Sequence, residues 1–441
     1  MDDRGDVLQW GDGYAKGLKA PETTLKGKNI ERVLLSQDKI VALSKDKTVY
    51  SFPISKNLQQ NGVKPRESSW IPGMSSESDI SYRILNPELG YLEKVADIAV
   101  GRDHLLVLTS KGRVFSSAVS YTYPSKGQLG IPNLGAATRP RGKPYDTLHE
   151  VTSLKDHKII QVAAGDYHSM VLDKDGKVFT FGDNLNGQLG FEYNPEVNIV
   201  DKPTILSLSA VYPDKSFRPK AIKIAAGGTN SYFMVDVEDT TKNRITADVL
   251  SCGTGIYGNL GNGRWTHVQG TPTKVKALSG LFEYDEATNR VNPIRLRDVR
   301  VGANHAAAIM ANITNIDASS SAHDVNYGFD VLFFGNNEFY QLGTGKRNNS
   351  NVPVYIQPLA GVPEDLRNPE FTGSNTSGEG GPMMSGIVGG AGGGDGAGAV
   401  AGTDQVHRFQ ATPATKVKGG GRAEQTVVCG RGNTAVYMRR V

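Results

Sequence analysis

The sequence predicts an all-β fold, a seven-bladed β-propeller in which residues 1–441 form a single domain. Three observations predict it. A unit of about 30 residues recurs along the chain, tight-turn signals divide each unit into short strands, and helical periodicity is absent almost everywhere. A small sheet of this kind cannot bury both faces alone, whereas several such sheets packed around an axis can.

The unit is clearest at residues 161–190, QVAAGDYHSMVLDKDGKVFTFGDNLNGQLG. Its VAAG and HSMVL segments are short, apolar and rich in small or β-branched residues, which is typical of strands. Asp175-Gly176 suits a tight type I′ turn and predicts a hairpin. Gly182 closes the third strand, and the GQLG segment predicts a turn leading outward. Each unit therefore contains about four strands.

Related copies recur along the chain and set the number of blades. The visible copies lie at 33–52, 98–130, 161–190, 224–263, 299–345 and 427–438. Aligned on one position, they bring into register Lys39, His104, His168, Asn230, His305 and Asn433. The spacings are 65, 64, 62, 75 and 128 residues. Because the last is close to twice the others, we expect a seventh unit between Leu342 and Val427.

The two ends of the chain predict how the ring closes. The last copy stops after its first half, at Val441, and residues 7–13, VLQWGDG, match the missing second half. We therefore expect an N-terminal strand to pair with the C-terminal strands and complete the last blade.

Glycine makes up 52 of the 441 residues, about 12% against a usual level of about 7%. Thirteen of these glycines lie within residues 371–402, a segment with almost no large apolar side chains. Such a segment cannot offset the entropy of ordering, so we expect it to be a disordered insertion in the propeller. The remaining excess marks the hairpins and strand ends of the repeated unit.

No catalytic motif of the HExxH, G-x-S-x-G or Cys–His zinc type occurs, so we expect no enzyme activity, no cofactor and no metal. His104, His168 and His305 belong to separate units, whereas a metal needs three or four converging ligands. We expect them to make structural hydrogen bonds to neighbouring loops.

Two basic clusters are candidate partner-binding residues. They are Arg139, Arg141 and Lys143, and Lys416, Lys418 and Arg422. Either suits an acidic protein, RNA or an anionic lipid, and the alternative is a solvated rim. The net charge of +4 is small, so nucleic acid is not an expected partner. No run of 18 apolar residues predicts a transmembrane helix, and peripheral membrane association stays open.

The pattern G-x-x-H, then D-G-x-V-[FY]-x-[FW]-G-x-N, then G-Q-L-G resembles the repeat of the regulator of chromosome condensation, a seven-bladed propeller family. The resemblance covers most of residues 5–441. The founding member is a nuclear exchange factor for a small GTPase that sits on chromatin. Its exchange hairpin and acidic residues have no residue-by-residue match here, and a basic N-terminal arm is missing.

The opening VLQWGDGYAKG, the degenerate first unit ending VYSFP and the polar insertion near the C-terminus resemble fungal mitochondrial members of this family. This resemblance implies a mitochondrial factor that supports respiratory chain assembly, notably of the cytochrome bc1 complex. Such a member is expected to carry an Arg-rich leader, and no such segment precedes residue 7.

We therefore expect a non-enzymatic scaffold whose protein partners meet loops on one face. The alternatives are a guanine-nucleotide exchange factor for a small Ras-like GTPase, in the nucleus or cytoplasm, and an RNA- or ribosome-associated binding protein.

Overall fold

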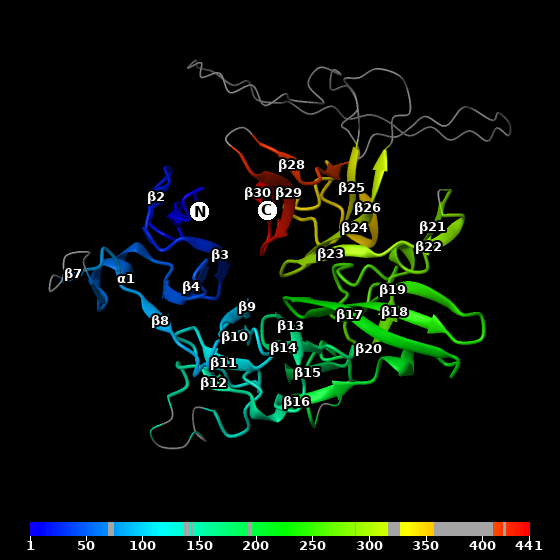
Figure 1. Ribbon diagram of the computed structural model, residues 1–441, viewed down its shortest axis with the longest axis horizontal. Coiled ribbons are helices and arrows are strands. Elements are labelled where there is room, and N and C mark those ends of the chain that lie inside the picture. The colour runs from blue at the N-terminus through cyan, green and yellow to red at the C-terminus, as the bar shows by residue number, and fades with distance from the viewer. Residues whose placement is uncertain are drawn as a thin grey trace, which may run out of the picture.

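The computed structural model describes residues 1–68, 75–135, 139, 142, 144–192, 194, 196–286, 288–315, 327–356, 409–417 and 420–441. In this part of the chain, antiparallel sheets radiate from a common axis (Figure 1). From the first blade to the last along the chain, the innermost strand of each sheet contacts the innermost strand of the next sheet. The fold is therefore an all-β propeller.

The blades follow one another in chain order, and the strands of each blade are given in the same order. Blade one has β3 (Ile30–Leu35), β4 (Lys39–Ser44), β5 (Val49–Pro53) and β8 (Arg83–Leu85). Blade two has β9 (Val95–Val100), β10 (His104–Thr109), β11 (Val114–Ala118) and β12 (His149–Glu150). Blade three has β13 (Ile159–Ala164), β14 (His168–Asp173), β15 (Val178–Asp183) and β16 (Ile199–Leu206).

The second half of the ring is built in the same way. Blade four has β17 (Phe217–Gly227), β18 (Asn230–Asp239), β19 (Arg244–Gly253) and β20 (Gln269–Lys274). Blade five has β23 (Leu296–Val301), β24 (His305–Asn315), β25 (Tyr327–Gly335), β26 (Ser350–Tyr355) and β27 (Gln410–Ala411). Blade six has β28 (Thr415–Lys416), β29 (Arg422–Cys429) and β30 (Thr434–Arg440).

Short elements connect the blades. They are the strand pairs β1 (Leu8–Gln9) with β2 (Glu22–Thr23), β6 (Arg66–Ser68) with β7 (Ser75–Glu77), and β21 (Phe282–Asp285) with β22 (Arg290–Pro293). The helical pieces are α1 (Lys56–Asn61), η1 (Thr152–Leu154), η2 (Leu208–Val211) and η3 (Lys276–Leu278). No described helix has the length and apolar character needed to span a bilayer.

The apolar core lies between blades rather than within them. Met170 and Leu172 on β14 pack with Phe233 and Leu250 of the next blade, and all four are almost fully buried. The hairpin predicted at Asp175-Gly176 forms, with Gly176 in the left-handed region at φ 84°. The predicted type I′ turn is wrong, because that turn needs a positive φ at both central residues and Asp175 does not have one. Each blade therefore depends on its neighbour to bury its apolar side chains.

The prediction of seven blades is wrong: the described residues form six. The stretch between Leu342 and Val427 contains β26, β27 and β28. Both β26 and β27 pair with β25, at Tyr355↔Leu332 and Ala411↔Phe329, so they belong to blade five. The long spacing therefore reflects an insertion within one blade. The glycine-rich segment 371–402, expected to be disordered, lies outside the described residues.

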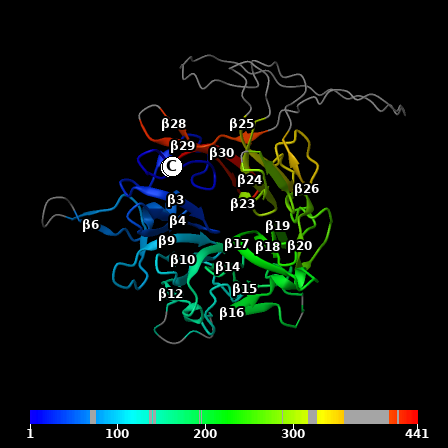
Figure 2. The same ribbon diagram turned by 45° about the vertical axis from the view of Figure 1, so that its right-hand side comes forward.

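The predicted pairing of the N- and C-terminal strands is not formed in the described residues. β1 pairs with β2, and β30 pairs with β29. In Figure 1 a gap in the ring separates the N-terminal segment from the C-terminal strands, and in the turned view of Figure 2 the two overlap. The physical reason is that Val7 and Leu25 are buried in the core of blade one. The N-terminal strand pair thus packs on the next blade and leaves β30 largely exposed.

We expect Leu25→Ala to lower the free energy of unfolding by about 2–4 kcal/mol, because Leu25 is 2% exposed in that core. Leu35→Ala is the matched control, since Leu35 is 63% exposed, and we expect a change within about 0.5 kcal/mol. Urea titration followed by circular dichroism measures both. Equal losses would contradict the packing of the N-terminal segment on blade one.

Candidate functional site

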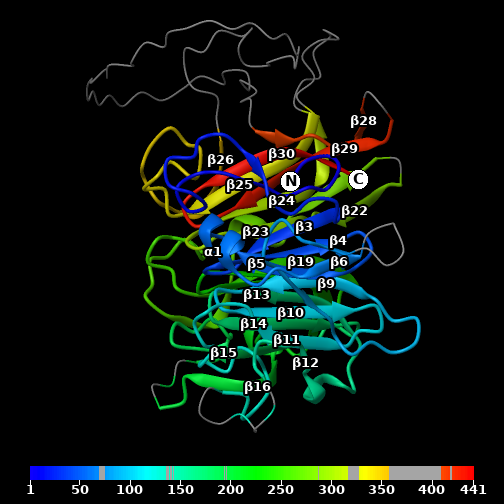
Figure 3. The same cartoon turned by 90° about the vertical axis from the view of Figure 1, so that its left-hand side faces the viewer.

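The turns between the first and second strands gather around the axis on one side of the ring. They comprise residues 36–38, 101–103, 165–167, 228–229, 302–304 and 430–433. The GQLG-type loops lie on the same side, because His168 at the start of β14 pairs with Gly182 near the end of β15. We call this side the turn face and the opposite side the hairpin face (Figure 3).

Backbone hydrogen bonds link the turns of consecutive blades. The Gln37 amide donates to the Arg102 carbonyl at 2.7 Å, and the Arg102 amide donates to the Asp166 carbonyl at 2.9 Å. The Asp166 amide in turn donates to Gly228 at 2.7 Å. This relay fixes the turns relative to one another, so side chains on them are held in place for binding.

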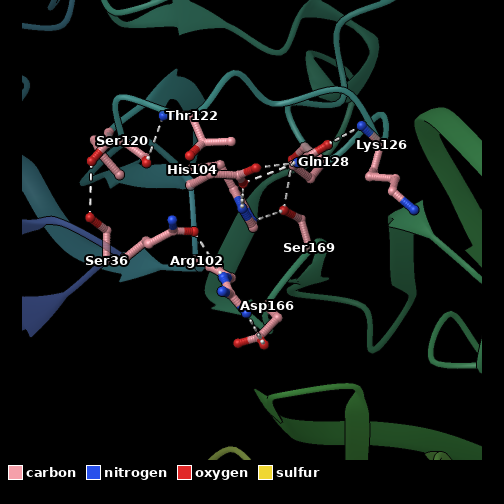
Figure 4. A network of polar contacts seen from close by, with 12 residues as sticks. Ser36, Arg102, His104, Ser120, Thr122, Lys126, Gln128, Asp166 and Ser169 are labelled. Carbon is pink, nitrogen blue, oxygen red and sulfur yellow. Dashed lines mark hydrogen bonds and ion pairs between the residues drawn. The ribbon is translucent and has the colours of Figure 1, made fainter.

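Histidines join neighbouring blades beneath the turn face. Nε2 of His104 lies 2.9 Å from Oγ of Ser169 in the next blade, and that hydroxyl donates to the Gln128 carbonyl at 2.8 Å. Because the serine proton is used for the carbonyl, the histidine donates through Nε2. Figure 4 shows this contact within a network that also contains Arg102, Lys126 and Asp166.

The same three-part contact, which we call the histidine staple, recurs at two further blade junctions. Its members there are His168, Ser231 and the Gln188 carbonyl, and His305, Thr434 and the Gln341 carbonyl. The expected structural role of the three histidines is confirmed. The described residues contain no group of three or more metal-ligating side chains.

The glycine of the G-x-x-H pattern makes room for the imidazole. A Cβ on Gly165 would lie 2.0 Å from Cε1 of His168, and one on Gly101 would lie 2.1 Å from Cε1 of His104. The glycine and the histidine of each repeat are therefore one packing unit.

Burial keeps two of the staple histidines neutral. Loss of hydration lowers the pKa of His168 from its ordinary value of 6.5 to about 3, and that of His305 to about 4. Among the described residues, Nδ1 of each ring has no hydrogen-bond partner, so a proton placed there would be buried without an acceptor.

Where the histidine is replaced, other contacts join the blades. Lys39 takes its place in blade one, and there Oγ of Ser120 donates to Asp38 at 2.7 Å. Ser36 donates to the Val119 carbonyl at 3.0 Å across the same junction. In blade four, Asn230 donates to Thr254 within its own blade. The histidine staple is therefore one of several kinds of side-chain contact that hold neighbouring blades together.

Charged side chains on the turns reach across the axis. Asp166 of blade three lies 3.9 Å from the Arg102 guanidinium and 3.6 Å from that of Arg431 in blade six. Because these groups are partly exposed, their ion pairs contribute little to stability. They instead give the centre of the turn face a polar, charged surface.

Apolar side chains are exposed around this centre. They belong to the loops after the third strands and are Tyr121, Leu185, Ile256, Phe339 and Tyr340. Phe339 is 67% exposed and lies beside Gly432 of the next blade. Exposed apolar side chains on blades two to five, next to a polar centre, suit a protein partner, because buried aromatic side chains supply much of the energy of such interfaces.

Tyr340 is held in an unfavourable backbone conformation on this face. Its φ is 60°, and it occupies the position that Gly187 holds in blade three, where φ is 76°. Both amides make the same turn hydrogen bond, to Asn337 and Asn184 respectively. A bulky residue in the left-handed region costs roughly 1–2 kcal/mol, and such cost is often retained at functional sites. In the sequence, Tyr340 stands where other units have the first glycine of the GQLG segment, and this departure from the repeat is the signal that distinguishes it.

The described residues of the two basic clusters do not lie together on one surface. Arg139 precedes β12 near the turn face, with its guanidinium 4.9 Å from the Tyr145 ring. Arg422 begins β29 at the hairpin face and donates to the Ala414 carbonyl, and Lys416 pairs with it on β28. The other predicted residues, Arg141, Lys143 and Lys418, lie outside the described residues.

The fold and its histidine staples define a propeller built from a repeated sequence unit, and comparison with known families identifies that unit. The regulator of chromosome condensation (RCC1) repeat matches residues 125–172, 175–234 and 330–366, and a second description of this repeat matches residues 159–188. The chain therefore carries repeats of the regulator of chromosome condensation.

Curated relatives share this repeat. Protein FMP25, a mitochondrial protein of Saccharomyces cerevisiae, is 23% identical over 391 residues, which cover 81% of this chain and 59% of that protein. Protein pim1 of Schizosaccharomyces pombe is 28% identical over 225 residues, covering 48% of this chain and 40% of pim1. The chain thus spans less than two thirds of the length of either relative.

Solved structures confirm the fold. Human WBSCR16 superposes with a TM-score of 0.52 at 22% identity, covering 78% of this chain and 73% of the other. Prp20p of Saccharomyces cerevisiae, described with its binding to Gsp1p and histones, also gives a TM-score of 0.52 at 21% identity. That match covers 82% of this chain and 75% of Prp20p.

We expect the free energy of unfolding to fall as the pH drops from 6.5 to 5. In this range His168 and His305 are neutral when folded but protonated when unfolded, so the unfolded state binds more protons. Each contributes up to about 1.4 kcal/mol per pH unit. The double variant His168→Asn, His305→Asn uses the residue found at this position in blades four and six. This variant should have a lower free energy of unfolding at pH 7.5, but that free energy should no longer fall between pH 6.5 and 5, as urea titrations at each pH would show. An unchanged pH dependence would contradict the neutral state of the two histidines.

We expect Gly165→Ala to lower the free energy of unfolding by about 1–3 kcal/mol, because its methyl group would overlap the His168 ring. Gly13→Ala is the control, since no atom lies within 4 Å of a Cβ at that position. Thermal unfolding of both variants measures the difference. Similar midpoints for the two would show that the G-x-x-H glycine has another role.

Proposed function

We propose that this chain is a non-enzymatic interaction propeller of mitochondria that supports assembly of the respiratory chain. The similarity to mitochondrial FMP25 over 81% of the chain carries this proposal. The more specific target, the cytochrome bc1 complex, rests on the resemblance of the N-terminal segment and the degenerate first unit to fungal mitochondrial propellers.

The turn face is the surface that we assign to the protein partner. Its turns are fixed by the backbone relay and the histidine staples, so little ordering entropy is lost when a partner binds. Phe339 and Tyr340 present apolar area beside the charged centre formed by Asp166 and Arg431. This combination suits a protein surface with both apolar and charged groups.

The two basic clusters are secondary contacts in this proposal. Arg139 stands near the turn face, so an acidic segment of the same partner can reach it. Lys416 and Arg422 lie at the hairpin face and would meet a different partner. Arg141, Lys143 and Lys418 are included by their place in the sequence alone.

Guanine-nucleotide exchange on a small Ras-like GTPase is the second candidate. The similarity of the fold to Prp20p, which is described with its binding to Gsp1p, favours it. In this case the chain would act in the nucleus or cytoplasm. Nucleotide-release assays with purified full chain and a panel of small GTPases separate the candidates: clear acceleration supports exchange, and unchanged release supports the scaffold.

We expect loss of the gene in the source cells to reduce assembled cytochrome bc1 complex on blue-native gels of mitochondria. Re-expression of the chain should restore the complex, whereas the double variant Phe339→Ser, Tyr340→Gly should restore it weakly. Tyr340→Gly removes backbone strain, so the free energy of unfolding should rise by about 1 kcal/mol while function falls.

Val291→Ser, an exposed apolar residue of β22 on the hairpin face, is the matched control and should restore the complex fully. Normal levels of the complex without the gene would refute the assembly role. Full rescue by the double variant would exclude the turn face as the docking surface.

A further inference from the structure

The hairpin face carries a basic residue in register at the start of the innermost strand. The residue is Lys94 in blade two, Lys158 in blade three, Lys220 in blade four and Arg295 in blade five. The register is shown by the backbone: the carbonyls of Lys94 and Lys158 accept from Ser110 and Lys174, the equivalent residues after the second strands. These side chains therefore occupy corresponding places on this face in blades two to five.

On the hairpin face of blades one to three, exposed lysines outnumber the carboxylates that could pair with them. Within residues 45–48, 86–94, 110–113, 155–158 and 174–177, Lys47 and Lys174 each pair with one carboxylate, and Arg113 pairs with two. Exposed lysines without an ion pair to another described residue are Lys45, Lys94, Lys111, Lys155, Lys158 and Lys177. Exposed carboxylates outside those pairs are Asp46, Glu88 and Asp156. The surface is therefore positive.

An apolar tip stands among these lysines. Tyr91 is 86% exposed and Leu92 is 77% exposed, on the loop that leads into β9. A Cβ built on Gly90 would lie 3.4 Å from Nζ of Lys111, so this lysine flanks the tip. Two adjacent apolar side chains with this exposure have no intramolecular packing that explains them.

The tip is rigid because the residue after it is anchored. Glu93 is buried, accepts from the Gly90 amide at 2.8 Å and pairs with Arg113 at 2.9 Å. Arg113 also donates to the Glu88 carbonyl at 3.1 Å, which closes the loop from its other side. Leu92 is held at φ 57°, an unfavourable conformation for a leucine. The loop therefore presents Tyr91 and Leu92 to the solvent in a fixed position.

We propose that the hairpin face of blades one to three docks on an anionic lipid bilayer. Tyr91 and Leu92 enter the interfacial layer, where an aromatic ring and an aliphatic side chain are both favoured, and the surrounding lysines meet lipid phosphates. Each lysine close to an anionic surface raises the partition coefficient roughly fivefold. An exposed leucine among lysines favours a lipid surface over a nucleic acid, which offers the leucine no apolar layer.

This orientation leaves the turn face directed away from the bilayer. The two faces lie at opposite ends of the same short strands, so a lipid surface on one does not obstruct a protein on the other (Figure 3). The proposal is independent of the identity of that protein and goes beyond the assembly role.

Co-sedimentation of the full chain with vesicles tests the proposal. We expect binding to phosphatidylcholine vesicles that contain about 30% phosphatidylserine, and at least tenfold weaker binding to phosphatidylcholine alone. Binding to the anionic vesicles should fall as salt is raised, because exposed charges are screened. The variant Tyr91→Trp should show blue-shifted indole fluorescence on binding.

Two sets of variants separate the tip from the charge. Tyr91→Ser with Leu92→Gly should weaken binding about tenfold, and glycine relieves the backbone strain at 92, so the fold is kept. Lys94→Gln, Lys111→Gln and Lys158→Gln should weaken binding to anionic vesicles and remove most of its salt dependence. Phe339→Ser on the turn face is the control and should bind as the parent does.

Three results would overturn the proposal: no binding to anionic vesicles, vesicle binding that both sets leave unchanged, and binding of polyglutamate in place of vesicles. The last would assign the face to an acidic protein. Circular dichroism of each variant establishes that a loss of binding does not arise from unfolding.

Discussion

The contacts that join neighbouring blades are the constraint on which the arrangement of the blades depends, and the histidine staple is the form that recurs at three junctions. A blade cannot bury its own apolar side chains, so the ring is stable only if each sheet is held at a fixed position against the next. The His168 ring, the Ser231 hydroxyl and the Gln188 carbonyl meet this need without charge. The glycine at 165 lets the ring lie against its own turn. These buried contacts hold the turns of the turn face in fixed positions.

The sequence carries much of this architecture, because the staple needs particular residues at fixed spacing. Gly165 and His168 recur as a pair, and from them the propeller, the strand pattern and the structural role of the histidines could all be predicted. The number of blades could not. An insertion and a missing blade both lengthen the spacing between repeats, and only the pairing of β27 with β25 distinguishes them. The predicted pairing of the N- and C-terminal strands was not found for a similar reason. Val7 and Leu25 are buried in the core of blade one, and this packing depends on the tertiary structure rather than on the local sequence.

The candidate site was less predictable, because its residues are distinguished by conformation rather than by type. An exposed tyrosine or leucine is ordinary in composition, and its significance lies in a positive φ at Tyr340 and Leu92. The repeat register gave one signal, a tyrosine where other units have glycine. No such register exists for the loop at 86–94, and its anchoring by Glu93 and Arg113 joins residues far apart in the chain. The basic clusters were chosen by local charge, and their described members, Arg139 on the one hand and Lys416 and Arg422 on the other, lie toward opposite faces.

The insertion in blade five has a consequence for how this chain tolerates change in length. β26 ends at Tyr355, paired with Leu332, and β27 begins at Gln410, paired with Asp330. The chain therefore leaves and rejoins the blade at positions two residues apart on β25. Any polypeptide whose own ends lie close together can occupy such a position without stretching the ring. Blade five thus offers a natural point of attachment, where an added domain, such as a fluorescent reporter, would be carried at the periphery of the disc while the histidine staples at its centre stay intact.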